Sequence, residues 1–88
     1  MSAGPEFLRR SRLEIMQSIL SLCLQGERSS ARKTHIMYKC NLSFKQLGKY
    51  LETMTDLGLL EVNRGSYTVT EKGKRFLEEF QGLKRLLQ

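Results

Sequence analysis

The segment KCNLSFKQLGKYLETM, residues 39–54, constrains the fold more than any other part of the chain. An amphipathic stretch stops at Cys40-Asn41-Leu42, and a new one starts after Ser43, a residue type that favours the N-cap of a helix. We predict a short helix over residues 31–39 and a second helix over residues 44–57, joined by a tight turn. This pair is typical of a helix-turn-helix.

The segment LLEVNRGSYTVT, residues 59–70, predicts a β-hairpin. A turn at Arg64-Gly65 pairs Val62 with Tyr67 and places the apolar side chains of both strands on one face. Thr70 then caps a final helix over residues 71–87. With a first helix over residues 9–25, the order is helix, helix-turn-helix, hairpin and helix. We therefore expect a mainly α fold with a small β-hairpin, which is a winged helix-turn-helix.

The chain has 88 residues, which is enough for one small domain. Residues 1–8 include MSAGPEF, which resembles an expression-tag remnant, so we set them apart. We assign residues 9–70 to the winged helix-turn-helix and residues 71–88 to a C-terminal dimerisation helix. The wide apolar arc over residues 9–25 predicts a helix covered on two sides, which Gly26 ends in a left-handed conformation.

The final helix carries an apolar seam that predicts a homodimer. Phe76, Phe80, Leu83 and Leu87 are spaced by four, three and four residues, as in a coiled coil of about two heptads. The alternative is that this face packs on the first helix and only closes the core. We expect dimerisation, because one hairpin and two short helices are too little to cover both apolar faces of the first helix.

The formal net charge of +6 favours a polyanionic partner. Six basic residues and no acidic residue lie between Arg28 and Lys49, and the exposed face of the helix over 44–57 is basic in its first half.

RRSR at 9–12 is a further cluster, which we expect to form an arm that reaches phosphates. The alternative is a solvated basic surface. The residues predicted to contact DNA from the recognition helix are Ser43, Phe44, Lys45, Gln46 and Lys49. Those predicted to contact the DNA backbone are Arg32, Lys33 and Lys39, and those predicted on the wing are Asn63, Arg64 and Ser66.

Other classes of site find little support in the sequence. His35, Cys23 and Cys40 lack the spacing and the fourth ligand of a zinc site, so we expect no metal. Glycines are scattered singly, and no paired carboxylates or nucleophile–base arrangement stands out, so we expect neither an enzyme nor a cofactor. Gly48 inside the recognition helix predicts close approach of a neighbouring backbone. No apolar run approaches a membrane span, and we expect a cytoplasmic, chromosome-associated protein.

The runs KTHIMYKCNLSFKQLGKYLETMTDLGLLE and YTVTEKGKRFLEEF resemble the small archaeal winged-helix proteins related to the ten-kilodalton chromatin-associated dimers of hyperthermophiles. The similarity covers residues 10–87. It implies dimerisation through antiparallel pairing of the last helices, and binding of double-stranded DNA by the third helix and the wing. Phe44, at the start of that helix, either stays in the core or presents its ring outward.

The leading hypothesis is a homodimeric transcriptional regulator that binds double-stranded DNA. One alternative is a sequence-neutral, chromatin-organising DNA binder. Another is a winged-helix protein-interaction module that does not bind DNA. RNA fits less well, because the deep groove of an A-form helix does not admit an α-helix.

Overall fold

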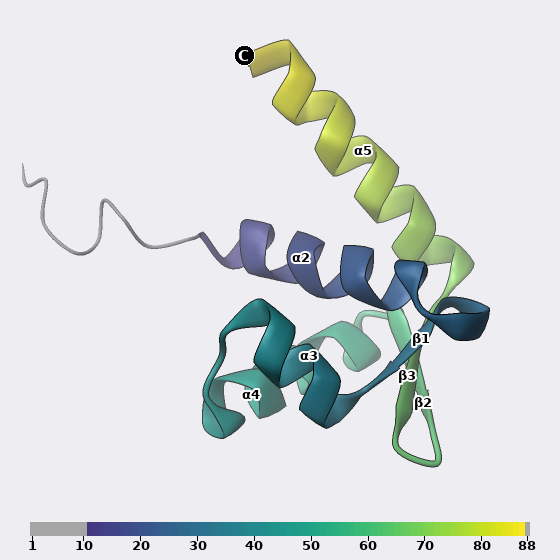
Figure 1. Cartoon of the computed structure of the whole chain (residues 1–88). Helices are drawn as coiled ribbons and strands as arrows, with labels where there is room; N and C mark the ends of the chain where they lie inside the picture. Colours follow the sequence, from purple (N-terminus) through teal and green to yellow (C-terminus); the bar gives the residue numbers. More distant parts are fainter. Residues whose placement is uncertain (1–10, 88) are drawn as a thin grey trace, which may run out of the picture.

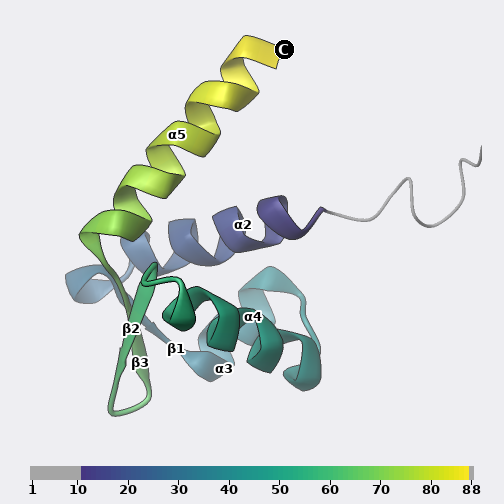
Figure 2. The ribbon, with the colours of Figure 1, turned by 180° about the vertical axis from the view of Figure 1, so that it is seen from behind.

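The computed structural model describes residues 11–87 and has a winged-helix architecture (Figure 1). Its elements are α2 (Arg12–Gln25), a 3-10 turn (Glu27–Ser29), β1 (Ser30–Arg32), α3 (Lys33–Cys40), α4 (Phe44–Asp56), β2 (Leu60–Asn63), β3 (Ser66–Val69) and α5 (Glu71–Leu87). Helix α2 crosses the middle of the molecule, with α3, α4 and the hairpin on one side of it and α5 rising on the other (Figures 1 and 2). This confirms the mainly α fold with a hairpin. The expected tag remnant, Arg9 and Arg10 lie outside the described residues.

Helix α2 is the centre of the core. Ile19 and Leu20, which belong to the two predicted apolar faces, are both fully buried, and α2 contacts α3, α5 and the sheet. The second face is covered only in part, because Leu13 and Leu24, which lie on it with Leu20, are exposed. Burying one such side chain contributes about 1.5–3 kcal/mol. The helix begins at Arg12 rather than at residue 9, because Ser11 caps it: the Ser11 hydroxyl accepts from the Glu14 amide at 3.1 Å, and the Glu14 carboxylate accepts from the Ser11 amide at 3.1 Å.

The two cysteines, Cys23 on α2 and Cys40 on α3, are both buried thiols within this core. Burial, with a smaller contribution from Cys40, raises the pKa of the Cys23 thiol to about 12. The charged thiolate is poorly solvated there, so Cys23 stays neutral at physiological pH. It behaves as a small apolar side chain of the core.

A third strand, β1, is present that the sequence did not predict. It pairs antiparallel with β3, with Ser30 opposite Thr68 and Arg32 opposite Ser66, so the sheet order is β1-β3-β2. The predicted start of α3 at residue 31 is therefore wrong, and α3 begins at Lys33. The backbone of β3 needs hydrogen-bond partners on its second edge, and this short segment supplies them. Three residues are too few to show the alternation of a strand.

Two predictions about glycines are wrong. Gly26 ends α2 with a φ of −79°, which is not left-handed; it must be glycine because a Cβ would overlap the carbonyl oxygen of Ser30. Gly48 approaches no neighbouring backbone, since a Cβ there would meet nothing within 4 Å. Gly58, in contrast, adopts a φ of +79° after α4, where the sequence places the end of that helix.

The hairpin has the predicted register. Leu60 lies opposite Val69 and Val62 opposite Tyr67, with the turn at Arg64-Gly65. Its apolar face is buried only at the base, where Leu60 and Val69 enter the core, whereas Val62 is exposed. The outer half of the hairpin therefore projects from the domain as a wing (Figures 1 and 2).

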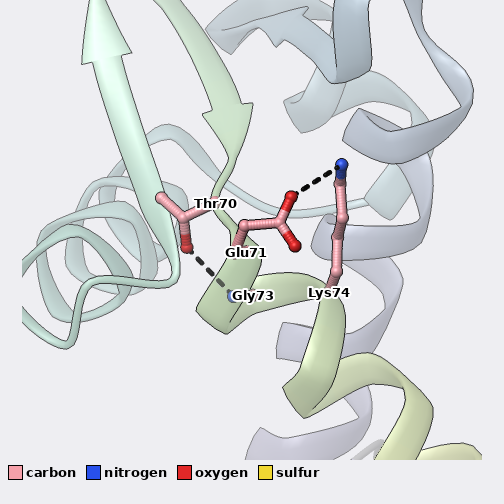
Figure 3. A network of polar contacts seen from close by, with 4 residues as sticks. All are labelled: Thr70, Glu71, Gly73 and Lys74. Atoms are coloured by element: carbon pink, nitrogen blue, oxygen red, sulfur yellow. Dashed lines mark hydrogen bonds and ion pairs between the residues drawn. The ribbon is translucent and has the colours of Figure 1, made fainter.

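The first turn of α5 is tied to the end of α4 and the start of β2. The Thr70 hydroxyl donates to the carbonyl of Gly58 at 2.5 Å. It also accepts from the amide of Gly73 at 3.0 Å, as expected for the predicted N-cap (Figure 3). Gly73 is buried here, and a Cβ on it would overlap the carbonyl oxygen of Leu59. Glu71 and Lys74 form an exposed ion pair at 3.5 Å beside this cap. The direction in which α5 leaves the domain is set by these contacts.

Replacing Gly73 with alanine should destabilise the protein by about 1–3 kcal/mol, because α5 must shift away from the Leu59 carbonyl. Gly48→Ala is the matched control: its Cβ meets open space within a helix, so it should stabilise by about 0.5–1 kcal/mol. Urea unfolding followed by circular dichroism measures both changes. Equal midpoints for Gly73→Ala and the wild type would refute the close packing of α5.

Candidate nucleic-acid interface

Helix α4 has one buried face and one charged face. Leu47, Leu51 and Met54 are buried in the core. Lys45 and Lys49 are exposed in the first half, and neither has a carboxylate partner among residues 11–87, where Glu71–Lys74 is the only ion pair. The exposed acidic residues of α4, Glu52 and Asp56, occur only in its second half. The N-terminal half of the charged face is therefore positive, and positive charge is suited to a polyanion.

The first turn of α4 is held by a capping box. The Ser43 hydroxyl accepts from the Gln46 amide at 3.1 Å, and the side-chain oxygen of Gln46 accepts from the Ser43 amide at 3.1 Å. Both side chains are exposed, and both have polar atoms engaged in the cap. The Gln46 side-chain NH₂ still has donors to offer. A bidentate contact with adenine would need the Gln46 oxygen as well, and so would break the cap.

Phe44 presents its ring outward, which settles the alternative left open by the sequence. Its side chain is 68% exposed, although the helical pattern places it beside the buried Leu47. It occupies the first position of α4, at the rim of the core, where Leu42 of the preceding turn is buried instead. The Lys33 ammonium lies over the Phe44 ring, 4.3 Å from its centroid. This cation–π contact joins the start of α3 to the start of α4.

The wing ends in a two-residue turn in which both φ angles are positive. Arg64 has a φ of +53° and Gly65 a φ of +81°, as in a type I′ turn, with Asn63 paired to Ser66 across the strands. Asparagine and glycine are favoured at the first position of this turn, because they adopt a positive φ most easily. An arginine there is in an unfavourable backbone conformation. The Arg64 side chain is exposed at the tip.

Strand β1 brings Arg32 to the wing. Arg32 lies opposite Ser66, and its Nη1 is 3.6 Å from the position that a Cβ of Gly65 would occupy. Lys33 follows directly and reaches Phe44. We use the name basic ridge for the basic side chains that occur in turn at the wing tip, at the start of α3 and in the first half of α4. The basic ridge consists of Arg64, Arg32, Lys33, Lys45 and Lys49.

Other predicted contacts lie around the basic ridge. Lys39 is exposed in the last turn of α3, and no contact among residues 11–87 is found that links it to the ridge. Arg12, the described arginine of the expected N-terminal arm, lines a hollow between α2 and α4 together with Lys49 and Tyr50. The sequence did not predict this hollow, because it depends on how α2 crosses α4.

The remaining chemistry-bearing groups do not assemble into a further site. His35 is exposed and lines a hollow with Glu27 and Arg32, and Cys23 is not among the residues that line it. Within residues 11–87, no three side chains of His, Cys, Asp or Glu gather where they could hold a metal ion. None of the helices in that same range is long and apolar enough to cross a membrane.

The comparison with known families agrees with the winged-helix architecture. The profile of the family described as winged helix-turn-helix matches residues 9–88. The chain belongs to the winged helix-turn-helix family. This winged helix superimposes on Sso10a-2, described as a DNA-binding protein from Sulfolobus solfataricus, with a TM-score of 0.70 and 28% identity over 89% of this chain and 85% of that one.

Two archaeal relatives, both uncharacterized proteins of Methanocaldococcus jannaschii, also resemble the chain. MJ0287 is 33% identical over 76% of this winged helix and 66% of its own length. MJ0290 is 31% identical over 91% of this chain, and the match covers 36% of MJ0290. The chain thus spans about two thirds of one relative and about one third of the other.

Replacing Arg64 with asparagine should stabilise the hairpin by roughly 0.5–1 kcal/mol, because asparagine tolerates the left-handed conformation better than arginine. Arg64→Val removes the same charge but adds a β-branched side chain, so it should destabilise. Thermal unfolding of the three proteins measures the order. If both variants shift the stability in the same direction, the change is due to the lost charge of Arg64 and not to its backbone conformation.

Proposed function

We propose that this protein is a homodimeric transcriptional regulator that binds double-stranded DNA through α4 and the wing. The observation that carries the proposal is the basic ridge, whose lysines on α4 have no carboxylate partner within residues 11–87. The structural likeness to Sso10a-2, itself described as DNA-binding, supports it. The protein in this proposal associates with the chromosome, needs no metal or cofactor and catalyses no reaction.

Helix α4 enters the major groove by its first half. A groove about 12 Å wide admits an α-helix, and in helix-turn-helix docking the N-terminal residues of the recognition helix contact the base edges. Lys45 and Lys49 then lie against phosphates and bases. Glu52 and Asp56, in the second half of α4, stay outside the groove, where their charge is tolerated.

The ends of the basic ridge contact the DNA backbone. Arg32 and Lys33 neutralise phosphates beside the groove, as does Lys39 from the last turn of α3. Arg64 is carried by the wing tip toward the adjacent minor groove, where a narrow groove attracts arginine. Its unfavourable φ supports this role, because backbone strain is retained at positions where function requires the side chain. Asn63 and Ser66 flank Arg64 and bond phosphates.

The second half of α5 provides the dimer contact. Leu77 packs on the core, and the rings of Phe76 and Phe80 stack with their centroids 6.4 Å apart. Beyond them, Leu83 and Leu87 are 58% and 84% exposed on the part of α5 that extends away from α2 (Figures 1 and 2). Pairing with the same helix of a second copy, antiparallel as the family resemblance implies, removes this apolar surface from water.

A sequence-neutral, chromatin-organising role is the second candidate. The capping box favours it, because Gln46 and Ser43 are engaged with the backbone and have fewer groups left to read bases. A regulator prefers its own site strongly over random DNA, whereas a chromatin-organising protein binds both within a few-fold. A winged helix that docks a protein partner would bind neither.

The double variant Lys45→Ala/Lys49→Ala should weaken binding to duplex DNA and flatten its salt dependence. Each phosphate contact contributes about 0.9 to the slope of log affinity against log salt, so the slope should fall by about 2. Fluorescence anisotropy of a labelled random duplex at several salt concentrations measures it. Lys72→Ala/Arg75→Ala removes the same charge from exposed positions of α5 and should leave the slope nearly unchanged. Failure of the wild type to bind at low salt would overturn the proposal.

Replacing Leu83 and Leu87 together with glutamate should convert the dimer to a folded monomer, because two buried charges per helix oppose pairing. Sedimentation equilibrium gives the mass, and circular dichroism checks that the fold persists. Arg85→Glu, on the opposite side of α5, is the control and should remain dimeric. A wild type that sediments as a monomer would refute the dimer while leaving DNA binding open.

A further inference from the structure

Phe44 is an apolar ring exposed within a basic surface. Its side chain is 68% exposed, although phenylalanine is among the residue types most often buried. Lys33 lies over the ring, and Lys45 follows Phe44 directly in α4. An aromatic ring at this place contributes nothing to phosphate binding, and the core is closed without it by Leu42 and Leu47.

The position of Phe44 in α4 decides what the ring meets in a complex. It is the first residue of the recognition helix, and the residues at that end of the helix contact base edges when a helix-turn-helix docks. Among the base edges in the major groove, the 5-methyl group of thymine is the apolar one, and phenylalanine is one of the side chains that contact it.

Lys33 prepares the ring for this contact. Its ammonium lies over one face of the Phe44 ring, 4.3 Å from the ring centroid. The other face and the edge of the ring are therefore the parts left for a ligand to contact. The same ammonium carries a positive charge beside the start of α4, where it can attract a phosphate when DNA is bound. The ring is therefore held between a cation that binds the backbone and a helix start that approaches the bases.

We infer that Phe44 reads the 5-methyl group of thymine in the major groove and so gives the protein a preference for A·T pairs at the start of α4. This inference rests on the proposed DNA binding and adds one element of base recognition to it. It is independent of the Gln46 side chain, and so it leaves the capping box intact.

The test compares two short A·T-rich duplexes that differ only in the 5-methyl group, one containing thymine and the other 2′-deoxyuridine. Wild-type protein should bind the deoxyuridine duplex more weakly than the thymine duplex, by about fourfold for each recognition helix that contacts a methyl group. This is the change in affinity expected when the burial of one methyl group is lost. Phe44→Ala should bind the two duplexes equally. Tyr38→Ala is the matched control: Tyr38 is an aromatic residue 83% exposed on α3, and its loss should leave the preference intact. Fluorescence anisotropy at constant salt gives the ratios.

The outcomes separate this inference from the proposed function. Equal binding of the wild type to both duplexes overturns thymine reading and leaves DNA binding in place. A preference that persists in Phe44→Ala also overturns it, because the methyl group is then sensed by another side chain or through DNA shape. Binding to neither duplex overturns the proposed function itself.

Discussion

Helix α2 buries Ile19 and Leu20 on neighbouring faces, and the other elements are arranged to keep both from water. The helix-turn-helix and the sheet cover one side, and the first turns of α5 cover the other. This division gives α5 two roles. Leu77 completes the core, whereas Leu83 and Leu87 extend beyond α2 and remain exposed. The same helix thus closes the monomer and offers the surface that we propose for the dimer.

The short strand β1 links the wing to the helix-turn-helix. Its pairing with β3 places Arg32 beside Gly65, and α3 begins at the next residue, where Lys33 reaches Phe44. Backbone hydrogen bonds therefore fix the wing relative to the recognition helix before any ligand is present. A surface held in this way loses less conformational entropy on binding than two independently mobile elements would.

Stability and recognition compete at two points of this surface. Gln46 stabilises the start of α4 through the capping box, and that contact engages the oxygen it would need to read adenine. Arg64 places a charge at the wing tip and accepts a backbone conformation that favours asparagine or glycine. In the proposed function, Gln46 favours stability over base recognition, whereas Arg64 favours binding over stability. Phe44 avoids the conflict, because its ring is exposed without disturbing the cap.

Several elements could be predicted from the chain because their signals are local. The N-cap at Ser43, the turn at Arg64-Gly65, the hairpin register and the cap at Thr70 all follow from residue type and spacing, because each depends on backbone preferences within a few residues. Other features could not be predicted, because they depend on segments that are distant in the sequence. Strand β1 forms because β3 offers an open edge, and Gly26 is required by the Ser30 carbonyl. The exposure of Phe44, with Leu42 buried in the preceding turn, also depends on how the helices pack. The charges of the basic ridge could be read from the chain, but the position of Arg32 beside the wing could not, since it depends on the pairing of β1 with β3.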